Sequence, residues 1–210
     1  MPQRFVHEER WNTLTHALGI AASALGGTAL IVIATLSGNP WQIVATSLFT
    51  ASLLLLYTAS TLYHAVSSPA AKLRLRVLDH CAIYVLIAGT YTPFLLGGLR
   101  GPWGWSLFGV IWGLALAGVV FKLFFTGRLH RLSTLIYIAM GWLVLIAAGP
   151  LLRTLGGVTI AWLAAGGIVY TAGTAFYHRE RMPYAHAIWH LFVLAGSTAH
   201  GIAVFTHLRM

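Results

Sequence analysis

Long apolar runs recur along the whole chain and are separated by short segments with turn or charge signals. About 20 apolar residues are enough to cross the roughly 30 Å hydrocarbon core of a bilayer as an α-helix. The pattern predicts an all-α fold, a seven-transmembrane-helix bundle that forms a single domain over residues 1–210. The predicted spans are 14–36, 42–66, 77–97, 103–123, 132–152, 158–177 and 184–206.

The breaks between these spans are predicted at residues 37–40, 72–76, 100–102, 122–131, 153–157 and 178–183. They contain Gly and Pro or clusters of Arg and Lys, which end helices or keep the chain at the membrane surface. Within the third span, Pro93 is expected to kink the helix and to widen an entrance to the bundle.

Composition supports the membrane assignment. Of the 210 residues, 58% are hydrophobic and 8% are charged, whereas a soluble domain has about 25% charged residues. The lone cysteine, Cys81, excludes an intramolecular disulfide, so helix packing has to hold the fold together.

The net charge of +9 is explained by topology rather than by a nucleic-acid partner. Of the 13 Lys and Arg residues, ten fall on the side of the N-terminus when seven spans are drawn, and three fall on the other side. Because positive residues favour the cytoplasmic side, this bias predicts a cytoplasmic N-terminus and a C-terminus outside. It also argues against binding of nucleic acid.

Asp79 is the acidic residue that stands out. Glu8, Glu9 and Glu180 fall in predicted cytoplasmic segments, but Asp79 falls in the first turn of the third predicted span. An ionisable side chain inside a membrane is costly and typical of a functional site. The alternative is a carboxylate that caps the helix N-terminus and pairs with Arg74 or Arg76.

Histidines cluster in the same predicted membrane layer. Ser60 and His64 are four residues apart at the end of the second span, and His186 and His190 have the same spacing at the start of the seventh. Residues at i and i+4 share one helix face, and two histidines so placed can bind one metal ion. Three imidazoles would give zinc three ligands and leave a fourth position for water, the pattern of catalytic sites.

In this interpretation His64, His186 and His190 are the Zn²⁺ ligands and Asp79 and Ser60 are the catalytic residues. Asp79 would orient or deprotonate the water or hold a ligand histidine, and Ser60 would donate a hydrogen bond. His16 lies near the same layer, as a partner of a ligand or a packing residue. The alternatives are polar packing of the histidines, or bis-histidine haem held by His64 and His190.

These residues resemble the hemolysin III branch of the progestin and adipoQ receptor family, which includes the adiponectin receptors. The resemblance covers nearly the whole chain and is carried by NTLTH (12–16), STLYH (60–64), LDHCAIYVLIAGTYTP (78–93) and HAIWH (186–190). It implies seven helices, a cytoplasmic N-terminus and zinc near the cytoplasmic face. The family pattern of Ser-x3-His, Asp and His-x3-His falls on Ser60, His64, Asp79, His186 and His190.

The resemblance also implies a function. The wider superfamily is similar to membrane hydrolases, with ceramidase-type amide cleavage attributed to the receptor branch, while bacterial members were named for haemolytic activity. The expected protein is a multi-pass protein of a cell membrane, the inner membrane of a bacterium, that hydrolyses an amide or ester bond of a membrane lipid. The alternative is a non-enzymatic sensor, channel or haemolysin-like pore in which zinc is structural.

Overall fold

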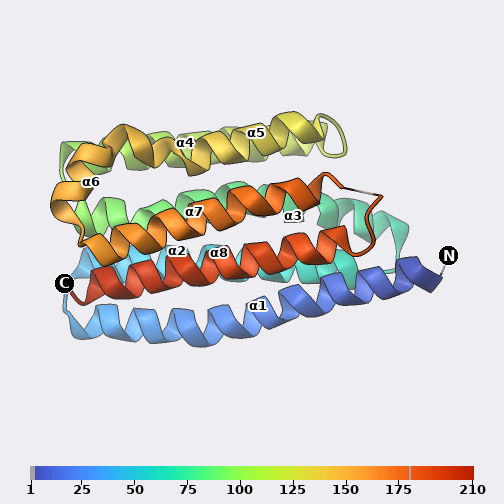
Figure 1. The fold of residues 1–210 in the computed structure, drawn as a ribbon, viewed down its shortest axis with the longest axis horizontal. Helices are drawn as coiled ribbons and strands as arrows, with labels where there is room; N and C mark the ends of the chain where they lie inside the picture. Colours follow the sequence, from blue (N-terminus) through green and yellow to red (C-terminus); the bar gives the residue numbers. More distant parts are fainter. Residues whose placement is uncertain (1–2, 180) are drawn as a thin grey trace.

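The computed structural model describes residues 3–179 and 181–210, so Glu180 lies outside the described residues. The described chain is helical throughout, with short connections (Figure 1). The elements are α1 (Gln3–Leu36), α2 (Pro40–Ala65), α3 (Pro69–Pro93), the π-helical turn η1 (Phe94–Gly98), α4 (Pro102–Phe125), α5 (His130–Gly141), the 3-10 turn η2 (Leu143–Ala147), α6 (Ala148–Thr154), α7 (Gly157–Tyr177) and α8 (Ala185–Leu208).

Seven helical stretches of the described chain are long and apolar enough to cross a membrane, which confirms the predicted fold class. The two termini lie at opposite ends of the bundle (Figure 1). Large apolar side chains on its outer surface are open to the surroundings, such as Leu25, which is 77% exposed, and Leu36, which is 83% exposed. In a membrane protein these side chains face lipid, so the apolar exterior needs no further partner.

Most helices pack against their neighbours in sequence: α1 on α2, α2 on α3, α3 on α4, and α7 on α8. Helix α8 also packs against α1, so the first and last helices of the chain lie side by side (Figure 1). The buried core includes the fully enclosed rings of Phe49, Tyr57 and Tyr84. Helix α5 makes fewer contacts, with α3 and α7.

Two helices begin earlier than the apolar pattern predicts. Helix α1 begins at Gln3 rather than at residue 14, and α3 begins at Pro69 rather than at residue 77. The predicted break at 72–76 is therefore wrong, and the turn lies at 66–68 instead. Pro69 starts α3 because proline suits the first helical position, where its missing N–H is not needed. The charged residues that follow Pro69 belong to the helix, although their low hydropathy predicts a loop.

The predicted fifth span, 132–152, is interrupted. Helix α5 ends at Gly141, and η2 and α6 follow it. The hydroxyl of Tyr91 accounts for the interruption: its single hydrogen is shared between the carbonyl oxygens of Met140 and Gly141, both at 2.8 Å, and its oxygen accepts from the Val144 N–H at 2.9 Å. This side chain replaces helical hydrogen bonds in the apolar interior, where unpaired backbone groups are costly.

Helix α3 changes geometry at Pro93, where the α-helix ends and the π-helical turn η1 begins. The backbone of this turn approaches α4 closely. The Gly104 N–H donates to the Leu99 carbonyl oxygen at 3.1 Å, and a Cβ added at Gly104 would lie 2.4 Å from the Leu95 carbonyl oxygen. The obstructing atoms belong to the backbone, so no change of side-chain rotamer can relieve the clash.

We therefore expect Gly104→Ala to destabilise the protein by about 1–3 kcal/mol, as for other overpacked sites. Thermal unfolding in detergent would measure the effect. Gly109→Ala is the matched control, because Gly109 lies on the same helix and an added Cβ there meets nothing within 4 Å. Equal melting temperatures for the two variants would contradict the close approach of η1 and α4.

Candidate metal centre

Three histidines from two distant segments meet at the end of the bundle that contains the N-terminus. His64 lies in the last turn of α2, and His186 and His190 lie in the first two turns of α8. One nitrogen from each ring can be chosen so that all three lie within 4.8 Å of one another. The ring centroids are 5.0 Å apart for His64 and His186, 5.1 Å for His64 and His190, and 4.6 Å for His186 and His190.

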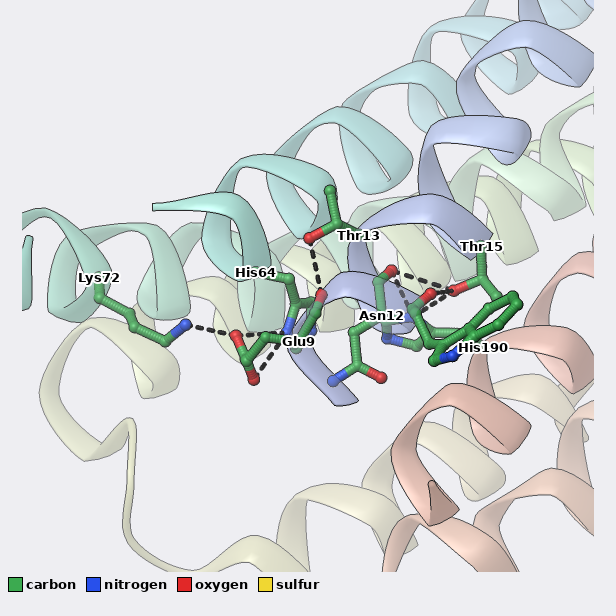
Figure 2. Close-up of polar contacts among 8 residues, drawn as sticks. Glu9, Asn12, Thr13, Thr15, His64, Lys72 and His190 are labelled. Carbon is green, nitrogen blue, oxygen red and sulfur yellow. Dashed lines mark hydrogen bonds and ion pairs between the residues drawn. The ribbon is translucent and has the colours of Figure 1, made fainter. Parts of the chain in front are cut away.

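The hydrogen bonds of His190 define its tautomer (Figure 2). Its Nδ1 lies 3.2 Å from the Asn12 carbonyl oxygen and 3.1 Å from Thr15 Oγ1. A carbonyl oxygen only accepts hydrogen bonds, so Nδ1 carries the proton and donates it. The lone pair of neutral His190 is then on Nε2, the nitrogen that remains for a ligand.

His64 is oriented in the same way. Its Nδ1 lies 3.3 and 3.4 Å from the two carboxylate oxygens of Glu9, and Glu9 also binds Lys72 Nζ (Figure 2). Since a carboxylate accepts hydrogen bonds, His64 Nδ1 is the donor. Its Nε2 is buried and has no hydrogen-bond partner among the described residues.

The arrangement fits a zinc ion. His64 Nε2 is a buried imidazole nitrogen without a partner, and such an atom is unfavourable unless a ligand occupies it. The outward hydrogen bonds of His64 and His190 match the outer contacts that orient metal-bound histidines. Three neutral nitrogen donors suit zinc and leave one position of a tetrahedron free.

The same geometry does not fit bis-histidine haem. A porphyrin between His64 and His190 would need a flat space separating the two rings. The His186 ring lies 5.0 Å from one ring and 4.6 Å from the other, and the two rings themselves are 5.1 Å apart. No slot for a macrocycle is left among the three.

Asp79 lies next to this cluster, although not in the position expected. Helix α3 begins at Pro69, so Asp79 lies about three turns into the helix rather than in its first turn. Among the described residues, no ion pair joins Asp79 to Arg74 or Arg76, which makes the helix-cap interpretation wrong. The side chain is 7% exposed and interacts with His64 and Ser60.

Ser60 lies on α2, one helical turn before His64, and is 1% exposed. Its hydroxyl is close to Asp79 but makes no hydrogen bond of normal geometry within the described part of the chain. Both residues line the same cavity, so the hydroxyl can donate to the Asp79 carboxylate or to a ligand there.

An apolar cavity of about 420 Å³ extends from the histidine cluster into the bundle. Ser60, Asp79, His186 and His190 line its polar end. Mainly apolar side chains of α3, η1, α5, η2, α6, α7 and α8 line the remainder, together with polar ones such as Thr90, Thr171 and His200. Along α3 and η1 the lining runs from Asp79 to Leu95, which is ~24 Å at 1.5 Å per residue.

Helix α1 supplies contacts that the sequence did not reveal. Glu9, Asn12 and Thr15 hold two of the histidines, whereas the sequence pattern places Glu9 in a cytoplasmic segment because the first predicted span begins at residue 14. The spacing of Glu9, Asn12 and His16, at i, i+3 and i+7, was the available signal of a shared helix face. His16 stacks on His190 at 3.5 Å between ring centroids.

Comparison with known proteins gives a consistent family assignment. Residues 5–201 match the family model described as Haemolysin-III related. The chain is 48% identical over 194 residues to a hemolysin-3 homolog of Bacillus subtilis, covering 92% of this chain and 91% of that protein. It is 48% identical to hemolysin-3 of Bacillus cereus, with 92% and 89% covered. It is also 30% identical to the human monocyte to macrophage differentiation factor, with 96% and 85% covered.

The geometry predicts that the purified protein binds about one zinc ion per chain. His64→Ala, His186→Ala and His190→Ala should each lose most of this zinc, because two histidines alone form a weak site. Elemental analysis of folded protein in detergent would measure it. His207→Ala is the matched control, since His207 lies on α8 about 25 Å beyond His190. Zinc retained in all three variants would contradict the site.

Proposed function

Because the chain belongs to the haemolysin-III related family of membrane proteins, we propose that it is a zinc-dependent hydrolase of an amide or ester bond in a membrane lipid. One observation carries the proposal: the three-histidine cluster, Asp79 and Ser60 lie together at the polar end of a long apolar cavity. A binding site for a lipid needs such an apolar volume, and a hydrolase needs the polar groups at its end.

In this proposal His64, His186 and His190 hold the zinc ion through ring nitrogens. When bound, zinc supplies Lewis acidity that polarises a carbonyl and acidifies water. The histidines themselves act by staying neutral and fixed. The hydrogen bonds from His64 and His190 to oxygens of α1 keep the ring proton on Nδ1. The lone pair of each Nε2 then remains available to bind the metal.

Asp79 is the group that takes up the proton of the attacking water and returns it to the leaving amine or alcohol when the C–N or C–O bond of the substrate breaks. It is the carboxylate that lines the cavity, and a positioned carboxylate can act as a general base over a single hydrogen bond. Ser60 donates its hydroxyl hydrogen to the carbonyl oxygen of the substrate, where negative charge develops. Its buried Oγ is suited to this role because the hydroxyl hydrogen can turn from Asp79 to a substrate oxygen in the cavity that both residues line.

The apolar wall binds the acyl chain of the lipid. Lining over ~24 Å of α3 and η1 is comparable with most of the roughly 30 Å hydrocarbon core. A chain bound along this wall places the carbonyl carbon, which is the polar end of an acyl group, beside the histidines. The same wall keeps bulk water away from the cavity and strengthens the electrostatic contacts of Asp79 and Ser60.

We expect zinc-loaded protein in lipid vesicles to release fatty acid from members of a panel of lipid amides and esters. Asp79→Asn should lower the turnover rate by about 10²–10⁴, the usual contribution of a general base, while zinc remains bound. Ser60→Ala should lower it less. Mass spectrometry of the released acid would measure both.

Ser52→Ala is the matched control for Ser60→Ala. Ser52 is a buried serine of the same helix, and its hydroxyl is already bonded to the Phe49 carbonyl oxygen at 2.7 Å. Its turnover should equal that of the wild type. Zinc-loaded wild type that cleaves no member of the panel would overturn the hydrolase and favour a non-enzymatic protein with structural zinc.

A further inference from the structure

We propose that Glu9 is a positioning residue of the metal centre, which fixes the ring orientation and the tautomer of His64 from helix α1 while Lys72 holds its carboxylate in place. The inference rests on the zinc binding in the proposed function, but not on hydrolysis. It assigns a role to an acidic residue outside the predicted ligand set.

The contact between Glu9 and His64 is directed. Both carboxylate oxygens lie within 3.4 Å of Nδ1, while Nε2 of the same ring is buried and has no hydrogen-bond partner among the described residues. A carboxylate hydrogen-bonded to the far nitrogen of a metal-binding imidazole fixes its orientation and raises its basicity as a ligand. Glu9 occupies this position relative to His64 (Figure 2).

Lys72 makes the arrangement specific. It binds Glu9 Oε2 from the first turns of α3, and its ammonium lies over the Tyr63 ring, 5.0 Å from the centroid. The side chains of Lys72 and Glu9 are 27% and 20% exposed, whereas that of His64 is 3% exposed. The pair therefore lies between the buried ring and water, with a cation to hold the carboxylate near the imidazole.

The same helix also holds His190. Glu9 and Asn12 are three residues apart on α1, and the Asn12 carbonyl oxygen accepts from His190 Nδ1 at 3.2 Å. One short segment of α1 therefore presents the Nε2 atoms of two ligands from two other helices. Asn12 contacts its histidine through the backbone, whereas Glu9 does so through its side chain. A Glu9→Gln substitution removes the charge of that side chain without altering its length.

A simpler interpretation is that Glu9 and Lys72 form an ion pair that ties α1 to α3 without affecting the metal. Exposed pairs of this kind contribute little to stability. The two interpretations differ in zinc affinity. An ion pair alone would leave it unchanged, whereas loss of a contact to a metal-binding histidine typically weakens metal binding 10–100-fold.

The test compares wild type with Glu9→Gln and with Glu8→Gln in detergent. Glu8 is the adjacent carboxylate, and it accepts from the Tyr184 N–H at 3.3 Å. Zinc affinity is measured by competition with a chelator, and the visible absorption of the Co²⁺-loaded protein reports ligand geometry. We expect Glu9→Gln to weaken zinc binding 10–100-fold and to shift the Co²⁺ bands, and Glu8→Gln to do neither.

Glu9→Asp provides a second variant if Glu9→Gln does not fold. It keeps the charge for Lys72 but withdraws the carboxylate from His64 by one methylene, so zinc affinity should also fall. Wild-type affinity and wild-type Co²⁺ bands in whichever of these variants folds would overturn the inference and leave the proposed function standing. Absence of zinc binding by the wild type would overturn both. Weakened zinc binding in a protein that cleaves no lipid would overturn the hydrolase alone.

Discussion

Imidazoles enclosed by helices need partners for both ring nitrogens, and this requirement organises one end of the bundle. Unpaired polar groups are expensive in an apolar environment. In His64 and His190 the structure satisfies Nδ1 with oxygens of α1 and leaves Nε2 as the acceptor nitrogen. Two acceptor nitrogens cannot form a hydrogen bond with each other. In the proposed function a zinc ion would be the shared partner of these nitrogens.

Helix α1 contributes to the histidine cluster through the polar groups that meet this requirement, rather than through its apolar surface. Many of its residues face outward, as shown by Leu14, Leu18 and Leu25, so much of the helix would be interchangeable with any other lipid-facing segment. Its first turns differ, because they carry the oxygens that the histidines of α2 and α8 need. The contact between the first and last helices in Figure 1 therefore has a chemical reason as well as a packing one.

The sequence was sufficient to predict the number of spans, because each apolar run is long enough to cross a membrane on its own. The proximity of His64, Asp79 and His190 also followed, since the alternation of helix direction places their segments in one layer. The helix starts did not follow. Glu9 and Lys72 are charged, so a hydropathy pattern predicts that they lie in loops, although the helices continue through them. The break after Gly141 depends on Tyr91, about 50 residues away, and no local pattern contains that information.

The interruption of the fifth span separates two parts of the molecule that differ in how closely their helices pack. Helices α1, α2 and α8 hold the histidine cluster through close mutual contacts, whereas α5 contacts its neighbours sparsely and is jointed to α6 by the short turn η2. Residues of α5, η2 and α6 form part of the cavity wall. This part of the wall is therefore built from two short helices and a 3-10 turn rather than from one continuous helix, and its course depends on the contact that Tyr91 makes from α3.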